Sequence, residues 1–103
     1  MITSSRQEMK TERSSTTCIV TLPSDQPSRT RELAKIEAQE RCHLLLNFSE
    51  TEDIMSEDLG AIIALRKRVM AKGGRLTLFN LAPNIYEVFK VTNLHKILDI
   101  CRP

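Results

Sequence analysis

The feature that most constrains this chain is a helix-like stretch flanked by two short apolar runs. The stretch Met55–Met70 reads MSEDLGAIIALRKRVM, and its large apolar residues recur every three or four positions, which is typical of a helix that buries one stripe. The run before it, His43–Phe48, is almost continuously apolar and predicts a strand buried on both faces of a parallel sheet. After it, the alternating run Arg75–Phe79 predicts the next strand. These runs together predict a strand–helix–strand unit.

Both ends of this helix are recognisable in the sequence. Ser56 is the expected N-cap, because its hydroxyl can accept a hydrogen bond from a first-turn N–H. The pair Gly73-Gly74 marks the end, because glycine readily adopts the left-handed conformation that closes a helix. The buried stripe is expected to contain Leu59, Ile62, Ile63, Leu65, Val69 and Met70. A second face carries only small residues, which leaves the backbone approachable by a partner: Gly60, Ala61 and Ala64.

The first third of the chain predicts one strand and one helix. Residues 1–15 are polar, and we expect a tail or an edge strand there, with a tail favoured for most of them. Thr16–Leu22 is rich in β-branched residues and predicts a strand. A helix is expected to follow, with Ser28 or Thr30 as its cap and its end near Glu40.

The last third continues the alternation of helix and strand. Pro83 fits the first turn of a helix, where its missing N–H costs nothing. Asn93 follows the last turn as a left-handed cap, and Ile97–Ile100 predicts a final strand. We therefore predict that residues 16–103 form one α/β domain, with a mostly parallel four- to five-stranded sheet and crossover helices.

Composition excludes several classes of function. A net charge of +2, with basic residues scattered among 13 acids, argues against nucleic-acid binding. No apolar run approaches the ~20 residues that span a bilayer, and the polar N-terminus lacks the apolar core of a signal peptide. A cytoplasmic location is therefore expected. Cys18, Cys42 and Cys101 are odd in number and far apart, which indicates reduced, mostly buried thiols.

Neither catalysis nor a cofactor is indicated by any motif. The glycines form no phosphate-binding pattern, and His43 and His95, in or beside predicted strands, are interpreted as structural. An acidic set could hold a divalent cation, so a small cation- or ligand-binding α/β domain is a rival prediction. The favoured interpretation is a solvated loop, first-turn acids that complement the helix dipole, and a surface for a basic partner. The acidic set contains Glu50, Glu52, Asp53, Glu57 and Asp58. The basic run Arg66–Arg68 is interpreted separately, as a solvated helix face.

From Cys18 to Ile100 the sequence resembles the STAS domain, the fold of bacterial anti-sigma factor antagonists. The resemblance is carried by HLLLNFSETEDIMSEDLGAIIALRKRVMAKGGRLTLFNLAP and by VFKVTNLHKILDI. The family pattern has Asp-Ser-Ser-Gly-Leu-Gly at the opening of a helix, a Gly-Gly strand start, an Asn-x-x-Pro turn and a late Thr-Gly-Leu. These elements align here with Met55–Gly60, Gly73-Gly74, Asn80–Pro83 and Thr92–Leu94.

The resemblance implies a protein-interaction module and not an enzyme. Its partner would be an anti-sigma factor that is also a serine kinase. A second candidate partner is an ABC-type ATPase, with this chain as a STAS accessory subunit of a transporter. The implied docking surface combines the loop Ser49–Asp53 with the small face of the helix. Its residues are Glu52, Asp53, Ser56, Glu57, Gly60, Ala61 and Ala64.

Two departures from the family pattern modify this expectation. The serine that the family phosphorylates aligns with Glu57, and the following glycine aligns with Asp58, so the usual switch is expected to be absent. Ser56 matches the first serine of the pair and is the remaining candidate for phosphorylation, although nearby acids would repel added charge. The chain also stops after the last predicted strand, where family members carry another helix. A partly open sheet face is then expected to favour a homodimer or a partner helix.

Overall fold

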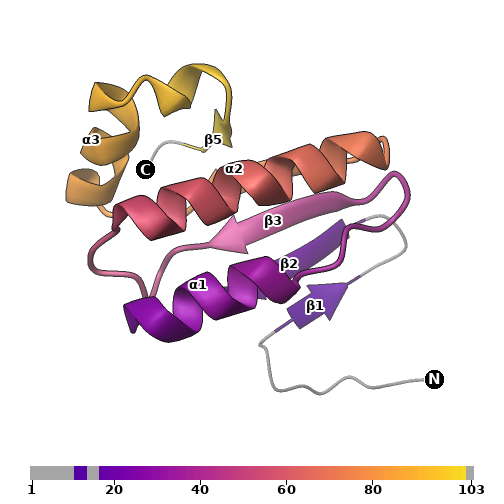
Figure 1. Cartoon of the computed structure of the whole chain (residues 1–103), viewed down its shortest axis with the longest axis horizontal. Helices are drawn as coiled ribbons and strands as arrows, with labels where there is room; N and C mark the ends of the chain where they lie inside the picture. The colour runs from indigo at the N-terminus through magenta and orange to yellow at the C-terminus, as the bar shows by residue number, and fades with distance from the viewer. Residues whose placement is uncertain (1–10, 14–16, 102–103) are drawn as a thin grey trace.

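The computed structural model describes residues 11–13 and 17–101, which form a five-stranded sheet with helices packed against it (Figure 1). The strands are β1 (Thr11–Arg13), β2 (Thr17–Thr21), β3 (His43–Asn47), β4 (Arg75–Phe79) and β5 (Asp99–Ile100). The helices are α1 (Gln26–Lys35), α2 (Ser56–Ala71), α3 (Pro83–Val91) and the 3₁₀ turn η1 (Leu94–Lys96). The alternation of strand and helix predicted after residue 16 is confirmed.

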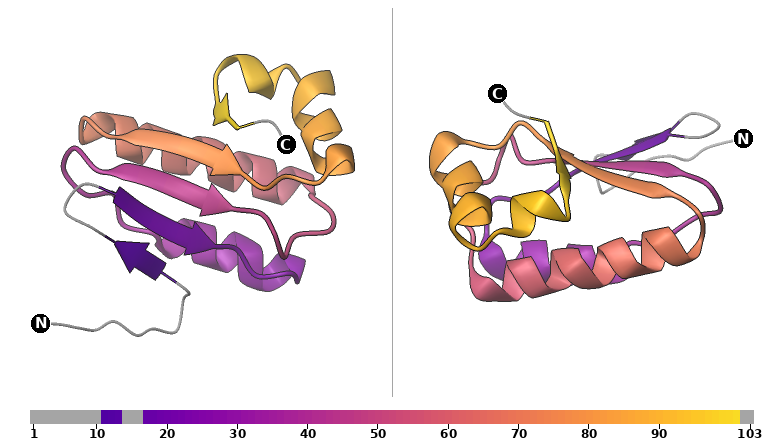
Figure 2. Two further views of the ribbon diagram at one scale, coloured as in Figure 1. Left: turned by 180° about the vertical axis from the view of Figure 1, so that it is seen from behind. Right: turned by 90° about the horizontal axis from the view of Figure 1, so that it is seen from above.

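Strand order explains the layered architecture. The sheet runs β1-β2-β3-β4-β5, and each neighbouring pair from β2 to β5 is parallel. Crossovers between parallel strands are right-handed, so a sheet that grows in chain order places successive helices on the same face. Figure 2 shows α1 and α2 side by side on that face. The predicted mostly parallel sheet is therefore confirmed.

The edge strand β1 settles one of the alternatives for the N-terminal segment. Thr11–Arg13 pairs antiparallel with β2, and Glu12 lies opposite Ile19. For these three residues the edge strand is the alternative that the structure shows. Unpaired backbone N–H and C=O groups at the edge of β2 can bind a further strand. The polar sequence of the N-terminal segment gives no sign of this pairing. Residues 1–10 and 14–16 lie outside the described part.

Helix α1 begins and ends earlier than predicted. Asp25 is the N-cap, and its carboxylate accepts a hydrogen bond from the Ser28 N–H at 3.1 Å. Hydrogen bonds from Ser28, through its side chain and its backbone, lower the pKa of Asp25. The predicted caps Ser28 and Thr30 both lie inside the helix. The predicted end near Glu40 was also wrong, because the helix ends at Lys35.

Left-handed residues close α2 and α3 as expected. Gly73 has φ 73° after α2, and Asn93 has φ 63° after α3.

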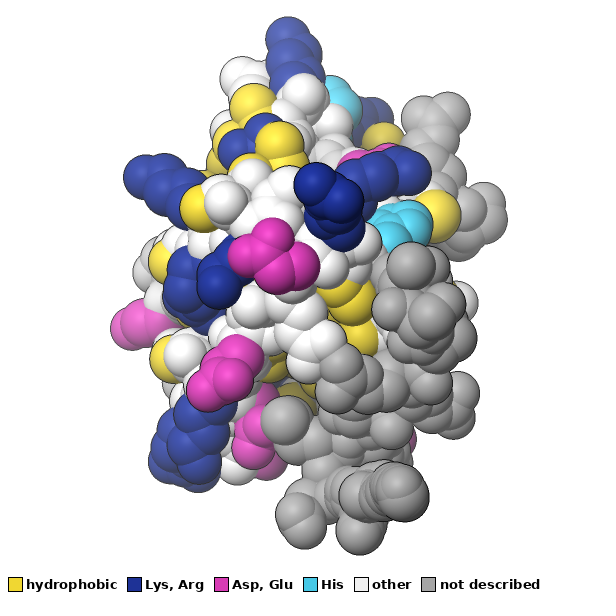
Figure 3. Space-filling model, turned by 90° about the vertical axis from the view of Figure 1, so that its right-hand side faces the viewer, with side chains coloured by type: hydrophobic (Ala, Val, Ile, Leu, Met, Phe, Trp, Pro, Cys, Tyr) yellow, Lys and Arg dark blue, Asp and Glu magenta, His cyan; other side chains and the backbone are white. Residues whose placement is uncertain are grey.

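Met70 in the last turn of α2 is 51% exposed, so its predicted place in the buried stripe was wrong. Lys and Arg side chains stand around this end of the molecule, with acidic side chains between them (Figure 3).

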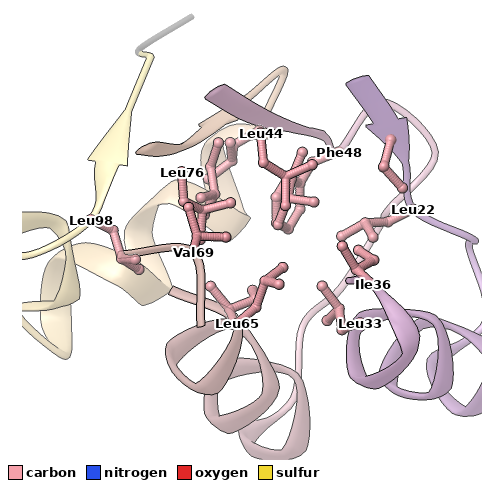
Figure 4. Packing of buried hydrophobic residues seen from close by; sticks show 14 of the residues in the cluster. Leu22, Leu33, Ile36, Leu44, Phe48, Leu65, Val69, Leu76 and Leu98 are labelled. Atoms are coloured by element: carbon pink, nitrogen blue, oxygen red, sulfur yellow. The ribbon is translucent and has the colours of Figure 1, made fainter. Parts of the chain in front are cut away.

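The core lies between the sheet and the helices. Leu44 and Leu76 point from the sheet towards Leu33 of α1 and Leu65 of α2 (Figure 4). Along β3 the burial alternates: Leu44 and Leu46 are buried, whereas the neighbours are half-buried. The prediction of a strand buried on both faces was therefore wrong. A run of leucines does not tell one covered face from two, because strand neighbours point to opposite faces whatever their polarity.

The cysteines correct a further expectation. No disulfide joins them, but Cys18 and Cys42 are half-buried and Cys101 is exposed, so the predicted burial was wrong.

The predicted homodimer stays a prediction.

Candidate functional site

Two loops meet where the parallel strands end. One loop follows β2 and leads into α1; the other follows β3 and leads into α2. Figure 1 shows the starts of α1 and α2 at the same end of the molecule. In parallel sheets with crossover helices, strand carboxyl ends and helix amino ends share one edge, where binding surfaces are commonly built.

The first turn of α2 is capped by Asp58 and not by Ser56. Met55 is the N-cap residue in extended conformation, and Ser56 is the first helical residue. The Met55 N–H donates to Asp58 Oδ2 at 3.0 Å, which is one half of a capping box. The predicted cap was therefore wrong by one residue. An acid at the third helical position can reach back to the cap N–H, so Ser56 is left exposed and uninvolved in capping.

Asp58 is also one half of a buried ion pair. Its Oδ2 lies 2.9 Å from Nη2 of Arg29, and both side chains have no exposed surface. The Thr30 hydroxyl donates to Asp58 Oδ1 at 2.9 Å. Asp58 is therefore not one of the solvated acids that the sequence suggested. An acid in a first helical turn faces the interior when the helix next to it supplies a cation.

The rest of the loop before α2 is held by hydrogen bonds to its backbone groups, from both the main chain and asparagine side chains. The Thr51 N–H donates to the carbonyl of Phe48 at 3.0 Å, and the Asn84 amide donates to the carbonyl of Glu52 at 3.1 Å. Asn47 Oδ1 accepts from the Ser49 N–H at 3.1 Å. The loop is thus attached both to the end of β3 and to the start of α3.

The outer face of α2 is open. A Cβ added at Gly60 would meet nothing within 4 Å. Ala64 is exposed one turn later, whereas Ala61 is half-buried and packs against the core. The other predicted docking residues are all exposed, in the loop before α2 and in its first turn: Glu52, Asp53, Ser56 and Glu57. All of the predicted docking residues except Ala61 are thus exposed, and Ala61 turns partly inward.

The comparison with known families identifies the fold. The model of the STAS domain matches residues 9–102. This chain belongs to the STAS domain family. A comparison with curated protein sequences finds no match.

Solved structures of bacterial proteins share the architecture of this STAS domain. A Thermotoga maritima protein described as a candidate anti-sigma factor antagonist is 18% identical with a TM-score of 0.72, over 92% of this chain and 86% of that chain. An anti-sigma-factor antagonist domain protein from Planctomyces limnophilus is 15% identical with a TM-score of 0.75, over 89% and 87%. The anti-sigma factor antagonist SpoIIAA, unphosphorylated, is 16% identical with a TM-score of 0.62, over 93% and 89%. Identities this low show a shared fold.

Two residues at this end of the STAS domain, Met55 and Arg29, are not among the predicted site residues. Met55 is 48% exposed and places an apolar side chain beside Ser56; no sequence signal separates an exposed methionine from a buried one. The burial of Arg29, in contrast, can be inferred from its position in the sequence. It precedes Leu33 and Ile36 at four- and seven-residue spacing, so it continues the buried stripe of α1.

The basic end of α2 also differs from the prediction. Arg68 is half-buried, and its Nη2 donates to the carbonyls of Leu33 at 3.0 Å and Ile36 at 3.2 Å. These carbonyls lie at the end of α1, where no further turn can bond them. The predicted solvated face is therefore correct for exposed Lys67 and wrong for Arg68.

The described part of the STAS domain contains no group of three or more His, Cys, Asp or Glu side chains arranged to hold a metal ion. The acid most deeply placed, Asp58, is bonded to Arg29. The rival cation-binding prediction thus finds no support in this geometry. Within the same residues, no helix combines the length and apolar character needed to cross a membrane.

Proposed function

We propose that this STAS domain is a regulatory protein-interaction module that docks an anti-sigma factor of the serine-kinase type. The observation that carries the proposal is the open face of α2. A partner can lie against the backbone at Gly60, where a Cβ itself would have nothing within 4 Å, and can continue over exposed Ala64. The loop before α2, held at Thr51 and Glu52, borders this face.

The family and its solved neighbours support this class of function. Three neighbours are described as anti-sigma factor antagonists, and the proposal extends that description to this chain. It includes a bacterial, cytoplasmic setting and a role in transcription regulation. The proposed role is docking without catalysis.

Charge indicates what kind of surface the partner presents. Glu52, Asp53 and Glu57 are exposed around the open face, so a basic partner surface would be steered towards it. Glu57 carries a permanent charge where the family pattern has a phosphorylated serine. The proposal is therefore a module without the usual switch. Incubation with cognate kinase and ATP tests this by intact mass, and the gain of one phosphate at Ser56 would contradict it.

A pair of substitutions on α2 tests the docking surface. Ala64→Arg places a long side chain on the proposed face, and Ala71→Arg places the same side chain at an exposed position in the last turn of the helix. The tagged protein and both variants are purified from the native host, and the copurifying ATPase is identified and quantified by mass spectrometry. We expect Ala64→Arg to lose the partner at least tenfold because the bulk separates the surfaces, and Ala71→Arg to retain it.

Thermal unfolding by circular dichroism accompanies both variants, because both positions are exposed and the fold should tolerate each change. Retention of the partner by Ala64→Arg would place docking elsewhere. Capture of an ABC-type ATPase, lost in the same variant, would keep the surface and replace the proposed partner by the transporter alternative.

A further inference from the structure

A buried charge pair lies directly beneath the proposed docking surface. Arg29 of α1 and Asp58 of α2 are 29 residues apart in sequence, and their side chains meet at 2.9 Å without exposed surface. Because both are buried, neither can touch a partner protein. Any effect of the pair on docking must therefore pass through the residues that it holds.

The pair connects three segments around the docking surface. Arg29 Nη1 donates to the carbonyl of Ser24 at 2.8 Å, in the loop that leads into α1. Its Nη2 lies 3.5 Å from the carboxylate of Asp53, in the loop that leads into α2. The Asp58 carboxylate accepts the N–H of Met55 at 3.0 Å, where that loop becomes helix. One guanidinium and one carboxylate thus join both loops to the first turn of α2.

Stability alone is a poor explanation for this arrangement. Removing two charges from water is costly, and apolar residues of similar size are often as good or better in such a place. Arg29 Nε is also buried and has no hydrogen-bond partner in the described part of the chain, and an unpaired buried donor carries a penalty. What apolar residues could not supply is the hydrogen bonds to Ser24 and Met55 and the ion pair with Asp53.

We infer that Arg29 and Asp58 are positioning residues that hold the loop 49–55 in one conformation, so that the docking surface is preformed in the free protein. A preformed surface costs less to order when a partner binds. The role in docking rests on the proposed function, whereas the role in holding the loop does not.

A shape-matched double substitution separates positioning from stability. Arg29→Met with Asp58→Leu removes both charges together and leaves neither buried alone. The matched control, Arg75→Met with Asp99→Leu, removes an ion pair of 2.6 Å between β4 and β5, in which both side chains are partly exposed. Amide hydrogen exchange is followed at Met55 and, as a reference for global unfolding, at Leu46 in β3.

We expect the Arg29→Met/Asp58→Leu variant to keep exchange protection at Leu46 and to lose protection at Met55 by about tenfold or more, because the acceptor of the Met55 N–H is gone. The control should leave both amides protected. Protection at Met55 that survives in the double variant would overturn the inference. If the double variant does not fold, relaxation dispersion on the unchanged protein decides: flat profiles for the loop amides support one conformation, and millisecond exchange overturns it.

Partner binding by the same variant separates this inference from the proposed function. A loosened loop with reduced capture of the partner supports both. A loosened loop with unchanged capture leaves the positioning role intact and contradicts docking at the loop.

Discussion

At the scale of single residues, Gly60 lies between two conflicting requirements: helix stability, which favours a residue with a side chain, and close approach of a partner, which favours glycine. Glycine inside a helix is costly because its unfolded chain is so free. No contact explains its presence, since an added Cβ would meet nothing within 4 Å. A close approach of another molecule is the use that the proposed function gives to this position.

Gly60→Ala should therefore raise the free energy of unfolding by about 0.5–1 kcal/mol, measured by urea denaturation, because helix propensity improves without a clash. Gly74→Ala is the contrasting control. A Cβ there would lie 2.4 Å from the Cys42 carbonyl oxygen, so that variant should lose stability. A destabilised Gly60→Ala variant would mean that the helix surface is not open at this residue.

The buried residues Arg29 and Asp58 show what residue-level analysis could and could not anticipate. The acid was identified in the first turn of the helix, but its side chain was expected in solvent. Burial of an acid depends on whether a cation arrives beside it, and here the cation comes from a helix 29 residues earlier. The apolar spacing of Arg29 with Leu33 was the single local indication of this contact.

At the scale of elements, α1 and α2 are joined by more than apolar packing. The end of α1 is bonded by Arg68 of α2, through the carbonyls of Leu33 and Ile36. This contact gives the end of α1 a tertiary cap. Propensity along α1 could not reveal it, because the donor belongs to another helix.

Arg68→Met tests this tertiary cap, since methionine keeps much of the aliphatic stem and removes the donors. We expect a loss of about 1–2 kcal/mol in the free energy of unfolding, because two carbonyls lose their partner. Hydrogen exchange should show the loosening at the last turn of α1. Lys67→Met, at the exposed neighbouring position, should change stability little. Equal effects of the two substitutions would rule out the cap.

At the scale of the whole molecule, the sheet has one face under the helices and one that carries polar pairs. Asp99 of β5 accepts hydrogen bonds from the Thr77 hydroxyl at 2.7 Å and from Arg75 at 2.6 Å. His43 of β3 lies 2.6 Å from the same Thr77 hydroxyl. These contacts join β3, β4 and β5 across the face opposite the core. The hydrogen bond from Thr77 and the neighbouring Arg75 lower the pKa of Asp99 below its ordinary value of 3.8.

A lowered pKa in the folded state predicts a defined pH dependence. The stability that Asp99 contributes should be fully present above its ordinary pKa of 3.8 and should be lost as the pH falls through the lower folded value, because the unfolded chain then binds the proton more readily. Urea unfolding from pH 6 downwards should show this loss in the unchanged protein. Asp99→Asn should be less stable at neutral pH and should approach the unchanged protein in acid. A stability difference that stays constant with pH would contradict the assignment.

The sequence by itself determined the local order of this protein. Apolar periodicity, β-branched runs and the residues that close helices depend on neighbours along the chain. They predicted strands at His43–Phe48 and Arg75–Phe79, the helix that is α2, and the left-handed positions Gly73 and Asn93. The parallel sheet followed from the alternation of these elements.

Only the tertiary structure decided which groups meet. It turned Asp58 inward to Arg29, left Met70 exposed, covered one face of β3 rather than two, and added Thr11–Arg13 to the edge of the sheet. Each outcome depends on which group from another element lies next to the residue in the folded chain. The sequence around the residue does not specify that group. The proposed docking surface depends on both: its small residues can be recognised in the sequence, whereas the buried charge pair beneath it forms only when α1 and α2 lie side by side.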